Sequence, residues 1–282
     1  MPRNALEAET RGSSPIEAAL DALAGRRIAV LTGAGISTDS GIPDYRGANS
    51  IPRTPMTFQA FLASATARRR YWAGSHLGWQ RFRAATPNAG HRALARLEAA
   101  GVVTGVLTQN VDALHERAGS RRVVDLHGRL DRVVCLSCGQ VYARDAVAGL
   151  ITQQNPWLAE TDAAVLRPDG DADVSRIDEF LPPLCNLCGG ILKPDIVFFG
   201  EFIPTDKFFD ARALVTQADA LLIAGSSLVV NSGIRFLDQA DKRSIPVVIV
   251  NRGSTRGDGR ATVKIDAGTS EALSALADRL AG

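Results

Sequence analysis

The chain has 282 residues, of which 45% are hydrophobic and 22% are charged, and its formal net charge is +2. Such a composition gives enough apolar residues for a sizeable core and excludes a disordered or fibrous chain. The small net charge gives no reason to expect a polyanionic partner, so direct nucleic-acid binding is not expected.

The N-terminal segment carries Glu7 and Glu9 and has no apolar stretch. A secretory signal needs an apolar region and a transit peptide is poor in acidic residues, so neither is expected. No apolar run approaches the roughly 18 residues that span a bilayer. The sequence therefore predicts a cytoplasmic protein without a membrane partner.

Strand and helix patterns alternate along the chain. Continuous apolar runs, typical of strands buried on both faces, are expected as strands at residues 26–32, 102–108, 220–224, 246–250 and 261–265. Helices are expected at residues 15–24, 90–100, 210–217 and 270–280. This alternation predicts an α/β fold with a doubly wound, mostly parallel, Rossmann-like sheet, in which ligands bind at the carboxyl ends of the strands.

Two segments interrupt this alternation and are expected as insertions into the sheet domain. Residues 48–87 are rich in aromatic residues and arginine at helical spacing, which predicts a helical insertion. Residues 128–194 contain all four cysteines and predict a smaller zinc-binding module. The Rossmann-like domain then comprises residues 1–47, 88–127 and 195–282.

Residues 45–97 contain nine arginines and no acidic residue. Two interpretations stay open for this asymmetry: a solvated helix face, or a groove that faces an anionic ligand. The aromatic side chains of the same region are interpreted as core in preference to the lining of a channel.

The cysteines form two C-x-x-C pairs, each followed by glycine: Cys135 with Cys138, and Cys185 with Cys188. Each short turn aims two thiolates at one ion, which suits tetrahedral zinc. Two disulfides or a redox pair are the alternatives, and the lack of an export signal favours zinc. Four protein ligands leave no open coordination position, so one structural zinc ion is expected, with no part in chemistry.

A glycine-rich turn follows the first predicted strand, where Gly33 and Gly35 precede Ser37 and Thr38. We expect this turn to enter a helix, whose backbone N–H groups and dipole favour a phosphate. An ordinary NAD dehydrogenase places an acidic residue about 20 residues beyond the turn. That position falls in the acid-free region here, which disfavours hydride transfer.

Polar residues follow two further predicted strands. Gln109, Asn110 and Asp112 offer carboxamide and carboxylate groups that suit an amide and sugar hydroxyls, with a helix cap as the alternative. His127 ends a short apolar strand just before a glycine, where catalysis and simple packing both stay open.

Several motifs occur in a fixed order between about residue 26 and residue 270. They are Gly33-Ala34-Gly35-Ile36-Ser37, Gly41-Ile42-Pro43-Asp44-Tyr45-Arg46, Gln109-Asn110-Val111-Asp112, Leu126-His127-Gly128, the two cysteine pairs, Lys193-Pro194-Asp195-Ile196-Val197-Phe198-Phe199-Gly200-Glu201 and Gly225-Ser226-Ser227-Leu228. Together they resemble the sirtuins, the NAD-dependent protein deacylases. The class II branch of that family is resembled by three stretches: Thr108-Gln109-Asn110-Val111-Asp112-Ala113-Leu114-His115, Arg70-Tyr71-Trp72 and Gly78-Trp79.

The resemblance implies a protein-lysine deacylase of the deacetylase type, which takes acylated-lysine protein substrates and releases nicotinamide and 2′-O-acyl-ADP-ribose. It implies that His127 is the general base and that Asn110 and Asp112 hold nicotinamide and its ribose. A protein mono-ADP-ribosyltransferase and a noncatalytic NAD-sensing module stay open as alternatives.

The resemblance also implies a set of residues that contact NAD and a segment that binds the protein substrate as an added strand. The NAD-binding set comprises Gly33, Ala34, Gly35, Ser37, Thr38, Asp44, Tyr45, Arg46, Gln109, Asn110, Val111, Asp112, Gly225, Ser226, Ser227, Asn251, Arg252, Gly253 and Thr269. The substrate segment comprises Val197, Phe198, Phe199, Gly200 and Glu201.

Overall fold

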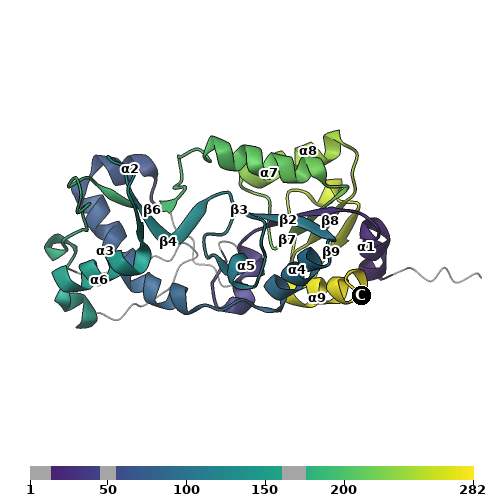
Figure 1. The fold of residues 1–282 in the computed structure, drawn as a ribbon, viewed down its shortest axis with the longest axis horizontal. Coiled ribbons are helices and arrows are strands. Elements are labelled where there is room, and N and C mark those ends of the chain that lie inside the picture. Colours follow the sequence, from purple (N-terminus) through teal and green to yellow (C-terminus); the bar gives the residue numbers. More distant parts are fainter. Residues whose placement is uncertain (1–13, 45–54, 161–175) are drawn as a thin grey trace, which may run out of the picture.

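The computed structural model describes residues 14–44, 55–160 and 176–282. These residues form an elongated molecule with a six-stranded sheet and its helices at one end and a three-stranded sheet with further helices at the other (Figure 1). None of the helices in these ranges is both long and apolar enough to cross a membrane.

The six-stranded sheet has the order β3-β2-β1-β7-β8-β9, and every neighbouring pair is parallel. Its strands are β1 (Ile28–Thr32), β2 (Val103–Thr108), β3 (Val123–Asp125), β7 (Ala220–Ala224), β8 (Val247–Val250) and β9 (Val263–Ile265). All five strands predicted from apolar runs are confirmed, each within two residues at its start. The burial of every residue of β1, β7 and β8 explains their continuous apolar sequences.

The strand order reverses at β1, which lies between β2 and β7. Thr32, the last residue of β1, pairs with Thr108 of β2 and with Ala224 of β7. The loops that leave these three strands therefore start side by side at one edge of the sheet. In open parallel sheets such a reversal creates the crevice in which ligands bind.

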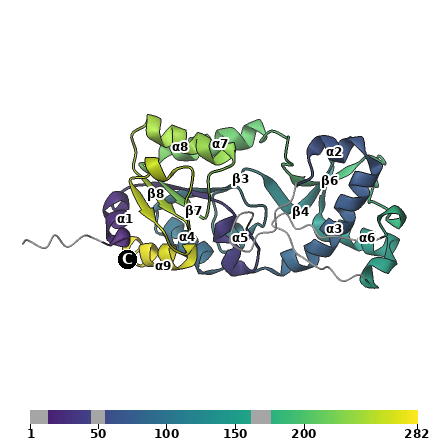
Figure 2. The ribbon, with the colours of Figure 1, turned by 180° about the vertical axis from the view of Figure 1, so that it is seen from behind.

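Helices cover both faces of this sheet (Figures 1 and 2). One face packs against α1 (Pro15–Leu23), α4 (Ala89–Ala99) and α9 (Thr269–Leu280), and the other against α7 (Thr205–Gln217) and α8 (Asn231–Lys242). The predicted helices are confirmed, although α7 begins five residues before the expected position. Helix α8 was not expected, because its sequence is mostly polar and only one of its faces is buried.

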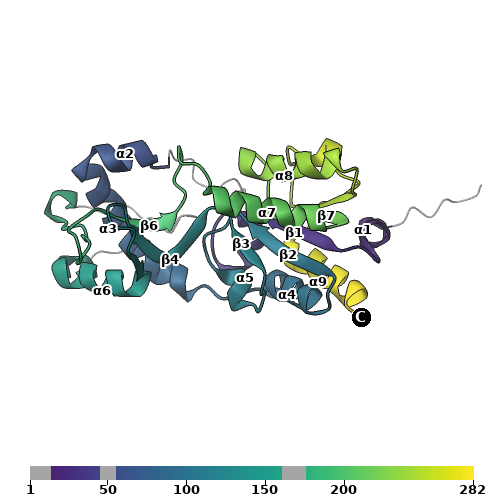
Figure 3. The same cartoon turned by 45° about the horizontal axis from the view of Figure 1, so that its top comes forward.

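The second sheet is antiparallel and has the order β5-β4-β6. It consists of β4 (Gly128–Cys135), β5 (Val141–Ala143) and β6 (Leu192–Ile196), with α2 (Phe58–Ala63), α3 (Ala65–Ala84) and α6 (Arg144–Gln154) packed around it. Figure 3 shows these elements together at the end of the molecule away from the C-terminus. The short helix α5 (Leu114–Arg117) lies between the two sheets.

The aromatic residues of the α2–α3 region belong to the core of this second end. Phe61, Trp72, Trp79 and Phe82 are buried in one cluster with residues of the three-stranded sheet. Trp72 donates its indole N–H to the carbonyl of Leu192, at 3.1 Å. The core interpretation of these aromatic residues is therefore confirmed.

Four arginines of the acid-free region bind groups of the protein itself. Arg68 and Arg92 donate to backbone carbonyls, Arg83 pairs with Asp145, and Arg96 pairs with Asp278. These four side chains do not form a groove for an anionic ligand, which favours the alternative of a solvated surface. Arg46 and Arg53 lie outside the described residues.

All four histidines of the chain have lowered pKa values in the folded protein, mainly because of burial. The pKa is about 4 for His76 and for His91, and it lies below the ordinary value for His115 and His127. An unfolded histidine takes up a proton near pH 6.5 while the folded one does not. Each of these histidines therefore lowers the stability as the pH falls below that point, by at most about 1.4 kcal/mol per pH unit and only until the folded ring is itself protonated.

Two carboxyl groups have the opposite effect: they increase the stability of the folded protein as the pH falls from about 7 to about 4. Burial raises the pKa of Asp112, and it raises that of Asp125 to about 7. The destabilising effect of the four histidines exceeds the stabilising effect of the two carboxyls. We therefore expect the urea concentration at the midpoint of unfolding to fall as the pH is lowered from 6.5 to 5. The variant His76→Gln should make this slope shallower. A midpoint that stays constant or rises on acidification would contradict the expectation.

Candidate active site and metal centre

The turn after β1 packs its glycine backbones directly against the turn after β7. A Cβ atom on Gly33 would lie 2.8 Å from the carbonyl oxygen of Gly225, and one on Gly35 would lie 2.9 Å from its Cα. Gly225 has φ +66°, and a Cβ there would lie 2.3 Å from the nitrogen of Ile36. Only glycine fits at these positions, so three of the predicted NAD-binding residues allow the two turns to pack backbone against backbone.

The glycine turn does not enter an α-helix, and that expectation was wrong. Ala34–Ile36 and Thr38–Ser40 form two short 3-10 turns instead. The carbonyl of Gly35 accepts the hydroxyls of Thr38 and Thr269, each at 3.2 Å, and these bonds occupy an acceptor that an α-helix would use. A bound phosphate would thus depend on backbone N–H groups, without the dipole of an α-helix.

Asn110 and Asp112 are held in place by the residues around them. The Nδ2 of Asn110 donates to the carbonyl of Gly33 at 3.1 Å and to Ser37 Oγ at 3.0 Å. Ser37 Oγ donates to Asp112 Oδ2 at 2.7 Å, and the other carboxylate oxygen accepts the N–H of Leu114 at 2.9 Å. Both N–H donors of the Asn110 amide are engaged, so its Oδ1 stays available as an acceptor.

Burial is also the main reason why the pKa of Asp112 is raised, and the bonds from Ser37 and Leu114 oppose that effect. The carboxylate therefore has strong demand for further donors, such as sugar hydroxyls. Asn110, Asp112 and Ser37 thus form one hydrogen-bonded group at the carboxyl end of β2, and their predicted role toward nicotinamide and its ribose stays a prediction.

His127 has one ring nitrogen bound to the backbone and one that can act as a base. Its Nδ1 lies 2.9 Å from the carbonyl oxygen of Gln109. A carbonyl oxygen only accepts, so Nδ1 carries the proton of the neutral ring and Nε2 has a lone pair. Burial lowers the pKa of His127, so the imidazole is neutral at pH 7. This is the protonation state that a general base requires.

Ser232 contacts the basic nitrogen of His127, and sequence reasoning missed it. Its hydroxyl lies 3.1 Å from His127 Nε2 and accepts the Nε2–H of Gln109 at 2.9 Å. The Oε1 of Gln109 accepts the hydroxyl of Ser226 at 2.7 Å. Ser232 lies 105 residues after His127, and no local motif marks it, so only the folded chain brings it to the site.

The residues predicted for the adenosine end of NAD lie at the ends of β8 and β9. Asn251 follows β8 and donates through Nδ2 to the carbonyl of Arg252 at 2.7 Å, which shapes its own loop. The N–H of Gly253 donates to Asp266 Oδ1 at 3.0 Å. Thr269 is buried and, through Gly35, ties the start of α9 to the glycine turn.

The other predicted NAD-binding residues border the same edge of the sheet. Ser227 follows the bare backbone of Gly225, and its carbonyl accepts the N–H of Arg256 at 3.1 Å. Val111 lies between Asn110 and Asp112, and its carbonyl accepts the N–H of Leu130 at 2.9 Å. Ala34 lies within the first 3-10 turn. Asp44 is half-buried and ends a described segment, while Tyr45 and Arg46 lie outside the described residues.

The predicted substrate segment runs away from the end of β6, next to His127. The N–H of Val197 donates to the carbonyl of His127 at 2.8 Å. Phe198 is buried, and its N–H donates to Glu201 Oε2 at 2.7 Å. The same carboxylate pairs with Lys193 at 2.9 Å. The side chains of Phe198 and Glu201 therefore hold the segment in place and do not face a peptide.

Phe199 and Gly200 complete this segment. The side chain of Phe199 is exposed, and its carbonyl accepts the N–H of Phe58 at 2.9 Å, which joins the segment to α2. Gly200 has φ +84°, a left-handed conformation that favours glycine, and its carbonyl accepts Nε2 of Gln59 at 3.2 Å. Of the side chains in the segment, that of Phe199 is the most exposed to a partner.

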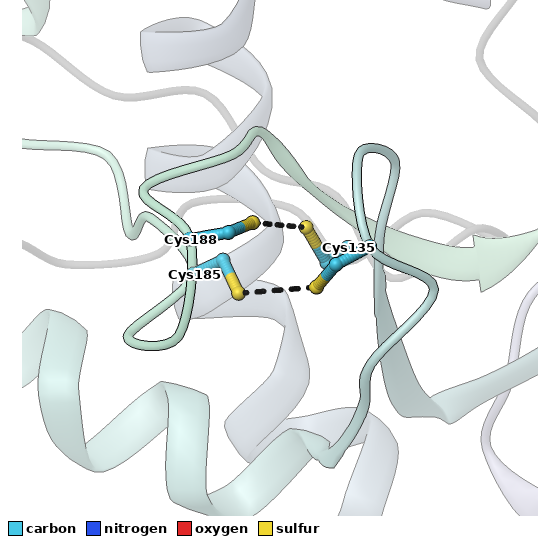
Figure 4. A group of neighbouring side chains, drawn as sticks. Cys135, Cys185 and Cys188 are labelled. Atoms are coloured by element: carbon cyan, nitrogen blue, oxygen red, sulfur yellow. Dashed lines mark hydrogen bonds between the residues drawn. The ribbon is translucent and has the colours of Figure 1, made fainter.

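The four cysteines gather into one cluster, as Figure 4 shows. The Sγ atoms of Cys135 and Cys188 lie 3.5 Å apart, those of Cys138 and Cys185 lie 3.7 Å apart, and all four lie within 4.8 Å of one another. A disulfide needs about 2.0 Å, so the cysteines are free thiols. Four sulfurs around zinc at about 2.3 Å lie about 3.8 Å apart, and the cluster fits this spacing.

The surroundings of Cys185 favour its thiolate, whereas the pKa of the Cys188 thiol is raised to about 12 beside the other cysteines. The hydroxyl of Tyr142 lies 3.1 Å from Cys185 Sγ. This bond, followed by bonds from the backbone N–H groups of Cys188 and Leu187, lowers the pKa of the Cys185 thiol to about 6. Thiolates are the form that binds zinc, so the donor set suits one structural ion.

We expect the purified protein to contain one zinc ion per chain, measured by elemental analysis. Cys185→Ala should remove the ion and destabilise the three-stranded sheet, because three ligands no longer close the site and structural zinc contributes folding energy. Tyr142→Phe is the matched control and should keep the ion. Full zinc content in Cys185→Ala, or none in the unaltered protein, would refute the assignment.

Comparisons with known proteins agree with this architecture. The Sir2 family profile matches residues 33–232. The chain is 56% identical over 262 residues to "NAD-dependent protein deacetylase 1" of Mycobacterium avium, covering 92% of this chain and 93% of that protein. It is 51% identical to "NAD-dependent protein deacetylase 1" of Streptomyces coelicolor, covering 95% and 91%.

Solved structures give the same result. A complex described as Sir2, p53 peptide and NAD+ is 31% identical, with a TM-score of 0.72, and the match covers 92% of this chain and 95% of that one. A Sir2 homologue in complex with ADP-ribose is 30% identical, with a TM-score of 0.74 and coverage of 94% and 96%. By its sequence motifs, its fold and these similarities, the chain belongs to the Sir2 family.

Proposed function

We propose that this protein is an NAD-dependent protein deacetylase that transfers the acyl group of an acylated lysine to ADP-ribose. The names of its relatives support this function. The observation that carries it is His127, a half-buried neutral imidazole whose Nδ1–H is bound to the backbone and whose Nε2 is basic. The carbonyl that binds His127 Nδ1 belongs to Gln109, which directly precedes Asn110 in the sequence.

The chain has residues suited to each part of NAD. The pyrophosphate would lie along the glycine turn, and Asn110 and Asp112 would hold the nicotinamide and its ribose. The N–H groups of Gly33, Gly35 and Gly225 already bind backbone carbonyls, so these glycines would contribute the close approach of the two turns and not hydrogen-bond donors. Bound NAD supplies a ribose that gives up nicotinamide and accepts the acyl group. The fixed amide and carboxylate orient that ribose without a cost of rearrangement during the reaction.

His127 would remove a proton from a ribose hydroxyl. Its Nε2 accepts the proton while Nδ1–H stays bound to the carbonyl of Gln109, so the ring keeps its orientation and the new charge faces a backbone dipole. In this structure the hydroxyl of Ser232 forms a hydrogen bond with His127 Nε2. A ribose hydroxyl that replaces Ser232 at Nε2 would keep the base hydrogen-bonded throughout.

The acylated protein would bind along residues 197–201 as an added strand. Val197 is anchored to His127, and Glu201 with Lys193 fixes the other end, so the backbone of the segment is preformed. A solved Sir2 complex with a p53 peptide supports a peptide substrate. Backbone bonds of this kind give affinity with little dependence on peptide sequence.

The division of the chain is also part of this proposal. Residues 1–47, 88–127 and 195–282 would form the NAD-binding domain, residues 48–87 the helical insertion and residues 128–194 the zinc-binding module. The class II branch is supported by the sequence motifs. A cytoplasmic location is supported by four thiols that are free and suited to zinc, which requires a reducing compartment.

The first test is mass spectrometry of the zinc-loaded protein with NAD and peptides that carry acetyl, propionyl, succinyl, glutaryl, lipoyl or long-chain acyl lysine. We expect O-acyl-ADP-ribose and free lysine from at least the acetyl peptide. His127→Ala should lower the rate by about 10²- to 10⁴-fold while zinc content and folding stay intact, because it removes only the base.

Other products would change the assignment. Release of nicotinamide without loss of the acyl group would indicate mono-ADP-ribosyl transfer or NAD hydrolysis. NAD binding with no product at all would indicate a sensing module. An unchanged rate in His127→Ala would refute the role of His127.

The pH dependence of kcat/KM gives a second test. The base works in its neutral form, and burial lowers the pKa of His127 below its ordinary value. We therefore expect the rate to be level near pH 7 and to fall only below about pH 6.5, as the ring takes up a proton. An acid limb centred at or above pH 6.5 would contradict this. Measurement at each pH of the fraction folded separates the effect from acid unfolding.

A further inference from the structure

The hydroxyl of Ser232, in the first turn of α8, binds other segments of the chain. The residue is 8% exposed. A serine at the start of a helix often caps free backbone N–H groups, but α8 begins without a side-chain cap. The hydrogen bonds of the Ser232 hydroxyl go to the side chains of Gln109 and His127 instead. Ser232 therefore serves the polar edge of the six-stranded sheet and not its own helix.

The contacts of Ser232 fix the position of each proton around the base. His127 Nδ1–H is bound to the carbonyl of Gln109 at 2.9 Å, so the lone pair of the neutral ring lies on Nε2. Ser232 Oγ accepts the Nε2–H of Gln109 at 2.9 Å and lies 3.1 Å from His127 Nε2. Because a lone pair only accepts, the hydroxyl proton of Ser232 must point to His127 Nε2.

The carboxamide of Gln109 is held in the orientation that this arrangement needs. Its Oε1 accepts the hydroxyl of Ser226 at 2.7 Å, and Ser226 Oγ in turn accepts the N–H of Leu228 at 3.3 Å. The NH₂ group of Gln109 therefore faces Ser232. Gly233 allows this approach, because a Cβ there would lie 3.3 Å from Gln109 Nε2 and 2.9 Å from Leu228 Cδ2. Glycine weakens a helix, so its place in the first turn of α8 agrees with a need for close contact.

We propose that Ser232 is a positioning residue for the NAD reaction: before NAD binds, its hydroxyl donates to Nε2 of His127 and keeps that nitrogen fixed and unprotonated. The structure contains each bond that this role requires, from Ser226 through Gln109 and Ser232 to His127. The inference rests on the proposed function, because it takes His127 as the base.

A hydrogen bond from Ser232 favours the neutral form of the ring. If Nε2 of His127 took up a proton, two donors would face each other and the bond would be lost. Burial also lowers the pKa of His127, whereas the bond to the carbonyl of Gln109 raises it. Ser232 therefore acts in the same direction as burial.

Charged groups on the neighbouring elements have partners of their own. They are Asp125 with Arg129 at 3.8 Å, Asp112 with Ser37 at 2.7 Å, and Lys193 with Glu201 at 2.9 Å. Asp125 has a pKa of about 7, mainly because of burial, and lies two residues before His127. Its titration is the same whether or not residue 232 is a serine. A difference between variants at residue 232 therefore reports the hydroxyl of Ser232.

Ser232 would leave Nε2 when a ribose hydroxyl takes its place. Both hydroxyls donate a proton to Nε2, and Ser232 Oγ can keep the bond from Gln109, so no proton moves in the exchange. The bond from Ser232 thus affects the free enzyme and not the complex with NAD. The pH dependence of kcat/KM reports the free enzyme, and that of kcat reports the complex.

The first experiment is an NMR titration of the histidine ring C–H signals in the zinc-loaded protein without NAD, with His127→Gln to assign the signal of His127. We expect Ser232→Ala to titrate at a higher pH, with the proton affinity of His127 about threefold to tenfold greater. Ser232→Thr keeps the hydroxyl and should titrate as the unaltered protein does. An unchanged titration in Ser232→Ala overturns the proposal.

The second experiment measures kcat and kcat/KM for NAD with an acetylated peptide from pH 5 to pH 9. In Ser232→Ala, the acid limb of kcat/KM should move to higher pH by the factor seen in the NMR titration, and Ser232→Thr should restore it. At pH 8, kcat should stay within about threefold of the unaltered enzyme. A limb that does not move overturns the proposal, and so does a loss of kcat as large as that in His127→Ala, since Ser232 would then take part in the chemistry itself.

Thr152 gives a matched control, because its hydroxyl lies near another buried histidine outside the site. Thr152 Oγ1 of α6 lies 3.3 Å from His76 Nε2. Thr152→Val should change the NMR titration of His76 and leave the acid limb of kcat/KM in place. An equal movement of that limb in Thr152→Val and Ser232→Ala would mean that loss of stability alone causes it, which overturns the proposal.

The two experiments separate this inference from the proposed function. The NMR titration needs no enzymatic activity, so it decides whether Ser232 controls the protonation of His127. A higher titration pH in Ser232→Ala together with no deacetylation by the unaltered protein would support the bond between Ser232 and His127 and refute the proposed function.

Discussion

The close contact between the turn after β1 and the turn after β7 determines where every other functional group can lie. Gly35 N–H donates to the carbonyl of Gly225 at 2.8 Å, and a side chain on any of the three glycines would separate the two turns. The contact is possible because Thr32 and Ala224 end their parallel strands in register. The same register places Thr108 beside Thr32, so the polar residues after β2 start at the same edge. Bare backbone and polar side chains thus meet at the reversal of strand order.

The polar side chains at this edge of the sheet are held by hydrogen bonds in which each donor and each acceptor is fixed. Asn110 donates to Gly33 and Ser37, and Ser37 donates to Asp112, so each group has one orientation in which all protons are used. His127 is fixed in the same way by the carbonyl of Gln109. Such fixed dipoles stabilise charge that develops during a reaction without the cost of reorganising solvent. Burial adds to the effect, since it keeps His127 neutral and raises the pKa of Asp112.

Much of this arrangement could be predicted from the sequence, because it depends on local patterns. The apolar runs identify the buried strands, the glycines mark the close contact, and the C-x-x-C pairs identify the metal ligands. Contacts between distant segments could not be predicted. Ser232 reaches His127 only because the start of α8 packs against Gln109, a contact between residues 123 positions apart. The 3-10 turns were missed for a similar reason, since Thr269 comes from the far end of the chain to bind Gly35.

The metal centre and the reaction site are linked through two strands. β4 begins at Gly128, immediately after His127, and ends at the metal ligand Cys135. β6 begins at Leu192, four residues after Cys188, and leads into Val197.

These strands pair from Cys135 with Leu192 to Gly128 with Ile196. A Cβ on Gly128 would lie 2.1 Å from the carbonyl oxygen of Asp195, so the reacting end of the pair is as closely packed as the metal end. The register of the pair shifts between Gly128 and Val133. A metal ion that joins the cysteine pairs therefore fixes one end of the strand pair, and the bond from Val197 N–H to the carbonyl of His127 fixes the other. A closed metal site with no chemistry of its own thus stabilises the strand pair that carries His127 and the proposed substrate segment at its other end.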